Sequence, residues 1–281
     1  MANKFLDYEL IDSGAGEKLE RFGDKFIVRP ASLAIWEKRS KKWNGIDAIF
    51  TPNEGWCFLK KQFNDWRIRL GDSLFLQLHL QKNGQIGVFP EHTNYLGEIE
   101  NAIEELKNET TPPQVLNLFA YTGMASIFCR GLGAEVTHID KAKAVLTWAR
   151  ENFELNKFEN GIRFIPEDAI IFLEREKKRG HKYQIIIADP PNFSRLSKNE
   201  NWDLDKVIID LVKAISAVLV PNGYLFISSH QSFAFAESVQ NLLIDLGRLK
   251  ANTFNVLPLN ITEQNSERKL PAGIITYGKL L

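Results

Sequence analysis

The residues of this chain with the clearest chemical potential are the pentapeptide DPPNF at positions 189–193, which follows the apolar run Ile185 to Ala188. A short run rich in β-branched residues is typical of a strand buried on both faces of a parallel sheet. The two prolines lack amide donors and fix φ, so we expect a rigid loop with available carbonyl oxygens. Such a carbonyl and the Asp189 carboxylate can hold a flat group through an amine or ring nitrogen, with its ring face on Phe193. The alternative is a strand that simply ends in a proline turn.

Two more carboxylates, Asp140 and Asp168, end apolar segments in the same way as Asp189. Ligands of open α/β sheets bind outside the carboxyl ends of the strands. Gly123 follows the first such segment, and Asp140 comes 17 residues later, near the spacing at which a Rossmann-like fold binds the ribose hydroxyls of a cofactor. A single aspartate at a strand end often only caps a helix. Three in succession, together with DPPNF, predict an adenosine site.

The turn that contains Gly123 reads FAYTGMAS and lacks the common phosphate-binding motifs. It has one glycine, whereas a dinucleotide site uses GxGxxG so that backbone amides can approach the pyrophosphate. The motif GxxxxGK[ST] is missing from the sequence as well. These observations make NAD, FAD and nucleoside triphosphates poor candidates. An adenosine ligand without phosphates remains, and S-adenosyl-L-methionine fits that description.

Strands and helices alternate from Gln114 to the end of the chain, which is the arrangement needed to bring these acids to one edge of a sheet. The helical segment after DPPNF carries apolar residues three and four positions apart. The alternation predicts an α/β fold with a doubly wound, mainly parallel sheet. The expected strands are 115–120, 135–140, 162–168, 185–188, 224–229 and 273–281.

The first 70 residues differ in pattern from the rest of the chain. Four tryptophans, short apolar alternations and the turn dipeptide Asn44-Gly45 predict a small β-rich module. A hairpin signal and a helical pattern follow, and Pro112-Pro113 ends them. We therefore expect three parts: a β-rich basic module at 1–70, a bridging hairpin and helix at 71–112, and the cofactor-binding domain at 113–281.

The β-rich module is locally basic in a chain whose formal net charge is zero. Between Glu17 and Arg69 the sequence has 12 Lys or Arg and 7 Asp or Glu. A basic patch with aromatic neighbours suits a polynucleotide, because Lys and Arg bind phosphates while Trp can stack on bases. The alternative is a solvated basic face over a small tryptophan core. The densest cluster is Lys38, Arg39, Lys41, Lys42 and Trp43.

Composition limits the class of protein. Hydrophobic content of 44% and charged content of 25% are ordinary for a globular protein. Cys57 and Cys129 are far apart and lack neighbours at metal-ligand spacing, so we expect neither a metal site nor a disulfide framework. The first residues hold no apolar leader segment, and no stretch is long enough to span a membrane. These features predict a cytoplasmic protein.

Four segments resemble the motifs of class I S-adenosylmethionine-dependent methyltransferases: VLNLFAYTG, HIDKAKAVLTWARENFELN, EDAIIFLE and IIIADPPNFSR. The resemblance is greatest to the bacterial branch that includes large-subunit ribosomal RNA base methyltransferases forming 5-methylcytosine and 7-methylguanine. It covers about residues 86–230, because QIGVFPEH is similar to the segment that lies over the cofactor in that branch. The resemblance implies a Rossmann-like, doubly wound, seven-stranded sheet with the last strand antiparallel, and S-adenosyl-L-methionine as cofactor.

The resemblance also assigns roles by position. Asp140 is expected to hold the ribose, Asp168 with the amide of Ala169 to face the adenine, and Asp189 to act as the catalytic residue that orients the acceptor. The implied cofactor contacts are Phe89, Pro90, Glu91, Asn117, Phe119, Ala120, Tyr121, Thr122, Gly123, Asp140, Lys141, Asp168, Ala169 and Asp189. The implied substrate contacts are Pro190, Pro191, Asn192 and Phe193.

One departure from the family pattern narrows the expected reaction. Enzymes that methylate carbon 5 of cytosine attack the base with a cysteine soon after the fifth strand, because an unactivated ring carbon needs covalent catalysis. This chain reads FISSH at 226–230 instead. We therefore expect a base nitrogen in RNA, most plausibly ribosomal RNA, as the acceptor, and a monomer or homodimer. The alternatives are a methyltransferase of small molecules or proteins, and a non-catalytic module that binds S-adenosylmethionine or RNA.

Overall fold

The computed structural model describes residues 5–107, 111–195, 201–230, 233–250 and 254–281, with the side chains of 193–195 and 201 outside this description. The chain divides into two compact units. The first unit contains residues 1–94 and 259–272, and the second contains residues 95–258 and 273–281. Residues 71–94 of the expected bridge therefore belong to the first unit and residues 95–112 to the second. The segment 259–272 belongs to the same unit as the N-terminal residues, and nothing in its sequence pattern predicts this grouping.

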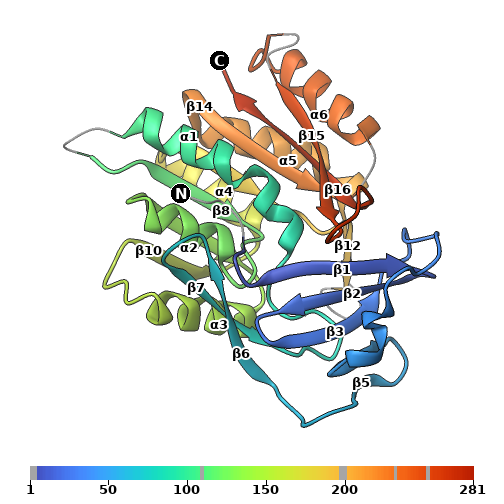
Figure 1. Ribbon diagram of the computed structural model, residues 1–281. Helices are drawn as coiled ribbons and strands as arrows, with labels where there is room; N and C mark the ends of the chain where they lie inside the picture. The colour runs from blue at the N-terminus through green and yellow to red at the C-terminus, as the bar shows by residue number, and fades with distance from the viewer. Residues whose placement is uncertain (1–4, 108–110, 196–200, 231–232, 251–253) are drawn as a thin grey trace. The chain divides into compact units, whose positions relative to one another are not determined.

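The second unit is built on a seven-stranded sheet in the order β10-β9-β8-β11-β14-β16-β15 (Figure 1). The first five strands in this order run parallel, and β16 pairs antiparallel with β14. The predicted Rossmann-like sheet with an antiparallel last strand is thus confirmed. The strands are β8 (Gln114–Leu118), β9 (Glu135–Asp140), β10 (Ile162–Pro166), β11 (Tyr183–Ala188), β14 (Leu219–Ser229), β15 (Asn255–Thr262) and β16 (Lys269–Lys279).

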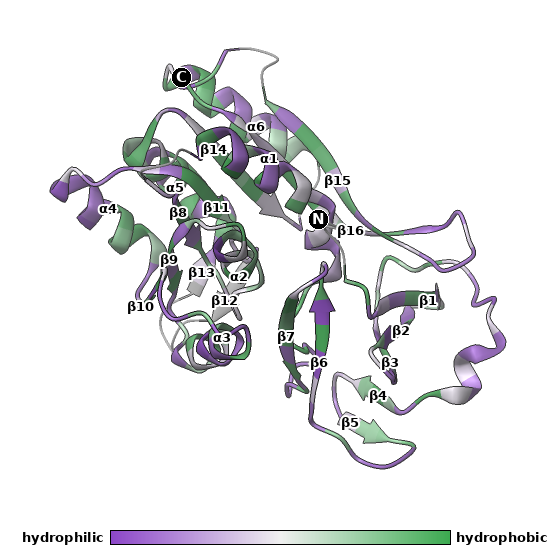
Figure 2. Cartoon of the chain, turned by 60° about the vertical axis from the view of Figure 1, so that its left-hand side comes forward, coloured by the Kyte–Doolittle hydropathy of each residue, from purple (hydrophilic) through white to green (hydrophobic). Residues whose placement is uncertain are grey.

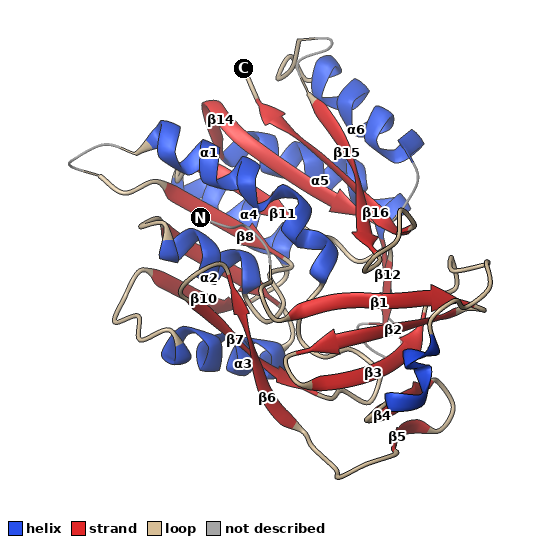
Figure 3. Cartoon of the chain, viewed as in Figure 1, coloured by secondary structure: helices blue, strands red, loops and turns tan. Residues whose placement is uncertain are grey.

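Helices cover both faces of this sheet (Figure 3). On one face α4, α5 and α6 enclose an apolar core with the buried strand residues, and α1, α2 and α3 lie on the other. Strand β11 is apolar and buried from Ile185 to Ala188, as expected for a strand covered on both sides (Figure 2). None of the helices in the described ranges is long and apolar enough to cross a membrane. The helices are α1 (Leu96–Leu106), α2 (Met124–Gly131), α3 (Lys143–Leu155), α4 (Ala169–Arg179), α5 (Leu204–Val218) and α6 (Phe233–Asp245).

The predicted apolar stripe of α5 is buried, but the helix ends earlier than expected. Leu211, Val212 and Ile215 are fully buried, as their spacing predicts. The helix ends at Val218 instead of continuing to Asn222-Gly223, and β14 begins at once. Pro221 explains the early end, because the residue before a proline disfavours helical backbone and proline has no amide to donate.

The first unit is rich in β-structure, as predicted for the N-terminal module. Its main sheet has the order β1-β2-β3-β4-β5, with neighbours antiparallel except for β3 and β4. A two-stranded ribbon and two short 3₁₀ helices, η1 (Lys41–Gly45) and η2 (Pro90–Tyr95), complete it. The strands are β1 (Tyr8–Gly14), β2 (Glu17–Phe22), β3 (Lys25–Pro30), β4 (Ala48–Thr51), β5 (Gly55–Phe58), β6 (Asp65–Leu70) and β7 (Leu74–His79).

The tryptophans of the first unit serve its packing. The indole nitrogen of Trp43 donates to Asp12 at 2.7 Å, and that of Trp36 donates to the Ser13 carbonyl at 2.9 Å. The Lys38 ammonium lies 3.8 Å from the centre of the Trp43 ring, so a cation already covers that face. These contacts favour the alternative interpretation of the sequence, in which the tryptophans belong to a small core. Trp43 is therefore part of the packing of the first unit.

Candidate active site

Strand register brings the predicted acids of the second unit together. Ala188 pairs with Leu118 on one side and with Ile227 on the other, so Asp189 emerges beside the start of the loop that follows β8. Leu118 also pairs with Ile139, which puts Asp140 next to the same loop. Because parallel strands end at one edge, the three strand ends form a single site at the carboxyl edge of the sheet.

The loop from Phe119 to Gly123 has an unusual backbone. Phe119, Tyr121 and Gly123 have φ values of 54°, 51° and 90°. A positive φ costs a residue with a side chain on the order of 1–3 kcal/mol, and such strain gathers at functional sites. A Cβ atom at Gly123 would lie 3.3 Å from the Cβ of Ala149, so glycine also allows the loop to sit close to α3. The loop is therefore a shaped surface rather than a plain connection.

Side chains from the neighbouring elements hold this loop in place. Asp140 accepts the Tyr121 amide on Oδ2 and the Ala142 amide on Oδ1, both at 2.9 Å. The fully buried Asn152 donates from Nδ2 to the Thr122 carbonyl at 2.8 Å. Burial raises the pKa of Asp140 above its usual value, although these two amides oppose the shift. A carboxylate oxygen can accept more than one hydrogen bond. Asp140 can therefore hold the loop and still accept hydrogen bonds from ribose hydroxyls.

A buried polar chain lies beneath the loop and contains Asn117. Its Nδ2 donates to the Ser126 hydroxyl at 2.9 Å, and that oxygen lies 3.0 Å from His138 Nδ1. Burial lowers the pKa of His138 to about 3, so the imidazole is neutral. Asn117 itself is only 3% exposed. The structure thus gives Asn117 a supporting position under the loop, and its predicted cofactor contact stays a prediction.

Asp168 caps a helix and contributes to the same edge. Its Oδ1 accepts the amides of Ile170 and Ile171 at 3.0 and 3.3 Å, which is the capping role weighed from the sequence. Its Oδ2 lies 3.8 Å from the Lys141 ammonium. Ala169 is the first residue of α4, so its amide has no partner within the helix. This corner offers an amide donor next to a carboxylate oxygen.

The orientation of Asp189 is fixed by a serine that the sequence analysis did not single out. The Ser228 hydroxyl, 1% exposed at the end of β14, donates to Asp189 Oδ1 at 2.5 Å. Asp189 itself is half-buried. The hydrogen bond holds the carboxylate at the strand end, next to the two prolines. Ser228 was detectable only by assuming that the ends of the strands 185–188 and 224–229 lie side by side.

The carbonyl groups of the DPPNF loop are not all available, which corrects one expectation. Trp202 donates from its indole nitrogen to the Pro191 carbonyl at 2.6 Å, and the Leu204 amide donates to the Asn192 carbonyl at 3.0 Å. In the part of the chain that the structure describes, no hydrogen bond reaches the Pro190 carbonyl. Pro190 is therefore the proline that can offer an acceptor beside Asp189. The side chain of Phe193 lies outside the described residues; its backbone begins β12 (Phe193–Arg195), which pairs with β13 (Asn201–Asp203).

Trp202 connects the two loops of the site. Its ring is 6% exposed and lies 5.0 Å, centroid to centroid, from the ring of Phe119 at an interplanar angle of 59°. The same side chain bonds to Pro191 through its indole N–H. One buried residue thus contacts both the loop after β8 and the DPPNF loop. Its role was missed because β13 follows a segment without a clear periodic pattern.

Phe89, Pro90 and Glu91 belong to the first unit, where Phe89 directly precedes η2 and the other two residues begin it. Glu91 is 7% exposed, and its buried Oε2 has no hydrogen-bond partner among the residues that the structure describes. Buried polar atoms nearly always have partners, so an orphan carboxylate oxygen is a candidate contact for a ligand. The predicted cofactor contacts of these three residues stay predictions.

The fold and the carboxyl-edge site define a class I S-adenosylmethionine-dependent methyltransferase. The family described as S-adenosylmethionine-dependent methyltransferase matches residues 41–240, and this chain belongs to that family. A solved S-adenosylmethionine-dependent methyltransferase from Agrobacterium tumefaciens is 33% identical with a TM-score of 0.87, over 97% of this chain and 90% of that one. The cofactor of this enzyme is S-adenosyl-L-methionine.

Curated relatives carry a ribosomal name. A protein named ribosomal RNA large subunit methyltransferase K/L from Pseudoalteromonas translucida is 32% identical over 99% of this chain and 36% of its own length. Its counterpart from Shewanella frigidimarina is 37% identical over 42% of this chain and 17% of its own length. The chain thus matches only about a third or less of the length of these curated relatives.

Proposed function

We propose that this methyltransferase transfers the methyl group to a nitrogen atom of a base in RNA, with ribosomal RNA as the acceptor. The names of the curated relatives support RNA as the substrate class. The observation that carries the choice of nitrogen is the Asp189–Ser228 pair at a strand end without a cysteine. The cytoplasmic location and the monomeric or dimeric state expected from the sequence stay predictions.

The residues of the second unit fit S-adenosylmethionine. Asp140 is assigned to the ribose hydroxyls, because its oxygens retain acceptor capacity beyond the two amides that they bind. The Ala169 amide and Asp168 Oδ2 are assigned to the edge of the adenine, one as donor and one as acceptor. The strained loop from Phe119 to Gly123 is assigned to the methionine part. When bound, the cofactor supplies an electrophilic methyl group on a sulfonium sulfur.

The acceptor end of the proposed site is the start of the DPPNF loop. The Asp189 carboxylate and the Pro190 carbonyl can accept the two hydrogens of an exocyclic amine, or Asp189 can position a base with a ring nitrogen. Both groups are held by the fold, Asp189 by Ser228 and the proline by its fixed φ. A nitrogen acceptor brings its own lone pair, so the work of these residues is placement. Asp189 then takes the proton that an amine sheds as the new N–C bond forms.

A ring carbon is a poorer acceptor for this site. Carbon 5 of cytosine needs a nucleophile that adds to the ring, and thiolates are the usual choice. The end of β14 offers Ser228 and Ser229, both buried, and Ser228 is committed to Asp189. The site therefore favours nitrogen chemistry.

The test uses ribosomal RNA from a strain that lacks the gene for this protein. The RNA is incubated with the purified protein and tritium-labelled S-adenosylmethionine, digested, and separated into nucleosides. Label in an N-methylated nucleoside is the expected result, and label in 5-methylcytidine would contradict the nitrogen assignment. Label in protein or small-molecule fractions, with none in RNA, would replace RNA by one of the alternative acceptors.

A further inference from the structure

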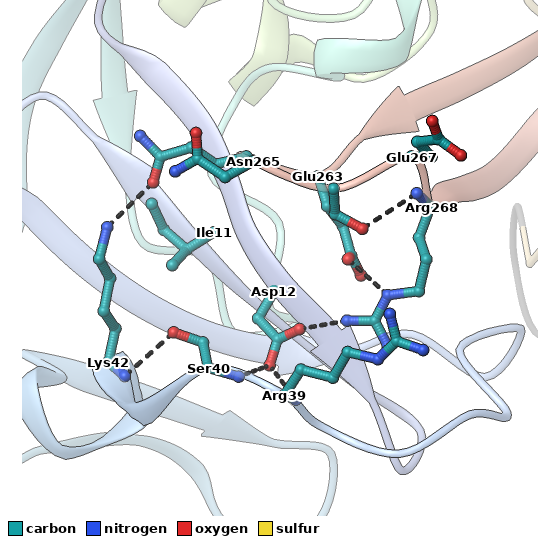
Figure 4. Close-up of a pocket in the computed structure, with 11 residues that line it drawn as sticks. Ile11, Asp12, Arg39, Ser40, Lys42, Glu263, Asn265, Glu267 and Arg268 are labelled. Atoms are coloured by element: carbon teal, nitrogen blue, oxygen red, sulfur yellow. Dashed lines mark hydrogen bonds and ion pairs between the residues drawn. The ribbon is translucent and has the colours of Figure 1, made fainter.

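The first unit contains a cavity of about 630 Å³ (Figure 4). The residues that line it are distant in sequence from the motifs of the carboxyl-edge site. One wall is the segment 39–42, whose last two residues begin η1, and the other is the turn 263–268 between β15 and β16. Asp12 on β1 lies at its base. We call this cavity the turn pocket. All of its walls belong to the first unit.

The buried acids of the turn pocket are already satisfied. Asp12 is 2% exposed and accepts the amides of Arg39 and Ser40, each at 2.8 Å, besides the indole of Trp43. Its other oxygen accepts from Arg268 at 2.5 Å. Glu263 is 3% exposed and accepts from the same guanidinium at 2.6 Å and from the Ser13 amide at 3.0 Å. These groups form a rigid base and leave little for a ligand.

The groups that remain for a ligand are mostly donors. The guanidinium of Arg39 is exposed and has no partner among the described residues, while the backbone that carries it is fixed by Asp12. Lys42 donates to Gln264 at 3.0 Å, which uses one of the three hydrogens of its ammonium. Figure 4 shows both side chains starting from one wall with their charged ends on opposite sides of the pocket, and Asn265 and Glu267 on the other wall. A phosphate fits the first wall, and hydroxyl or amine groups fit the second.

We propose that the turn pocket binds one phosphodiester-linked nucleotide of the RNA substrate, away from the base that is methylated. Arg39 and Lys42 bind the phosphates on the two sides of this nucleotide, since a guanidinium and an ammonium are the usual phosphate partners. Asn265 and Glu267 contact the ribose or the base edge through an amide and a carboxylate. This inference rests on the proposed RNA methyltransferase function. It also selects, among the basic residues of the first unit, those that act on RNA.

The pocket distinguishes these cations from others in the same cluster. Lys38 is paired with Glu17 at 2.5 Å and lies over Trp43, so its ammonium already has a carboxylate partner and an aromatic contact. A general attraction between RNA and a basic surface would give all exposed cations similar weight. The turn pocket instead predicts that Arg39 and Lys42 matter more than an exposed lysine elsewhere. Lys61 is such a residue, because it is exposed in the first unit and does not line the pocket.

The experiment measures binding of purified large-subunit ribosomal RNA by filter retention, over a salt series from about 50 to 200 mM. The proteins are the wild type, the double variant Arg39→Ala/Lys42→Ala and the control Lys61→Ala. S-adenosylmethionine affinity is measured in parallel by calorimetry. The double variant is expected to lose about tenfold in RNA affinity for each contact. The slope of log K against log salt is expected to fall by about 0.7 for each contact with single-stranded RNA.

Each outcome decides the inference. Weakened RNA binding by the double variant, with unchanged cofactor affinity and a near-normal Lys61→Ala control, supports the turn pocket. A double variant with the affinity and slope of a wild type that does bind RNA overturns the pocket alone. If Lys61→Ala loses as much RNA affinity as the double variant, the inference is also overturned, because RNA would then bind to the basic surface in general rather than to the pocket. A wild type that binds S-adenosylmethionine but not RNA overturns the proposed function together with the pocket.

Discussion

The Arg268 guanidinium lies 2.5 Å from the Asp12 carboxylate, although the two residues are 256 positions apart. The same guanidinium bonds to Glu263 at 2.6 Å and to the Glu37 carbonyl at 2.9 Å. The turn between β15 and β16 is thereby fastened to strand β1 within the first unit. This ion pair explains why residues 259–272 group with the N-terminal residues even though both flanking strands begin or end in the methyltransferase sheet.

Replacing Asp12 with Asn should destabilise the protein in a way that depends on pH. Burial raises the pKa of Asp12, but hydrogen bonds from Ser40, Trp43 and Arg39 and the charge of Arg268 outweigh it, so the folded pKa lies below the ordinary value of 3.8. A carboxyl with a lowered folded pKa contributes stability above its unfolded pKa and loses that contribution as pH falls through the folded value. Urea denaturation at pH 7 should show a loss of about 3 kcal/mol, because a buried partner is removed from Arg268.

The same comparison at low pH provides the control for Asp12. As pH falls below the ordinary value of 3.8 and through the folded pKa of Asp12, the wild-type carboxyl becomes protonated, so the difference between wild type and Asp12→Asn should shrink. Lys38→Ala removes an exposed ion pair and should change stability by less than about 1 kcal/mol at either pH. A difference between wild type and Asp12→Asn that stays constant from pH 7 to a pH well below 3.8 would show that the carboxylate charge is not what stabilises this contact.

Asp140→Ala should weaken S-adenosylmethionine binding strongly. The carboxylate is assigned to the ribose and also holds the Tyr121 amide at 2.9 Å, so its loss removes ligand contacts and loosens the loop. Charge-assisted hydrogen bonds contribute roughly 1.5–3 kcal/mol each, which corresponds to at least about tenfold in affinity. Calorimetry measures the change directly. Asn152→Ala separates the two effects, because it loosens the loop at Thr122 without touching the assigned ribose contact; affinity as low in this variant as in Asp140→Ala would reduce Asp140 to a loop support.

The residues of the site that follow from the periodicity of a single segment could be predicted from the sequence. Those that depend on how two strands pair could not. Strand and helix periodicity located Asp140, Asp168 and Asp189 at strand ends, because each belongs to a short segment with its own signal. Ser228 contacts Asp189 only because β11 and β14 are neighbours with Ala188 opposite Ile227. A single sequence contains no local information on that register. The contact of Trp202 with Pro191 was hidden for a different reason, because β13 follows a segment without a clear periodic pattern.

The first unit shows the limit of a local interpretation. Clustered lysines beside tryptophans gave a signal for nucleic acid, yet Trp43 donates to Asp12 and its face is covered by Lys38. The charges in such a cluster are visible in the sequence, whereas their partners come from distant segments. Gln264 is one such partner, since it lies opposite Lys42 only after the chain has folded. Composition therefore located the cationic region and could not select the cations within it.

Asp189→Ala should lower the rate of methyl transfer far more than it weakens cofactor binding. The carboxylate is assigned to the acceptor, so its removal affects placement of the reacting nitrogen and proton transfer, which together are worth about 10²–10⁴-fold. Single-turnover kinetics with saturating S-adenosylmethionine measure the rate, and calorimetry measures the affinity. Ser228→Ala should act in the same direction with a smaller effect, because it only frees the orientation of Asp189. Full activity of Asp189→Ala would move the acceptor site to other residues.

Trp202→Phe should slow methyl transfer while leaving S-adenosylmethionine affinity close to normal. Phenylalanine keeps an aromatic ring against Phe119 but cannot donate the hydrogen bond that now reaches the Pro191 carbonyl at 2.6 Å. The DPPNF loop would then lose a buried contact worth about 1–3 kcal/mol, and the acceptor nitrogen would be placed less accurately.

Trp202→Leu removes the ring as well and should also lower cofactor affinity, since the loop after β8 loses its packing. The kcat, the KM for S-adenosylmethionine and the thermal unfolding of both variants distinguish these effects. Equal losses of kcat and cofactor affinity in Trp202→Phe would mean that Trp202 acts through general stability of the fold rather than through the position of the acceptor loop.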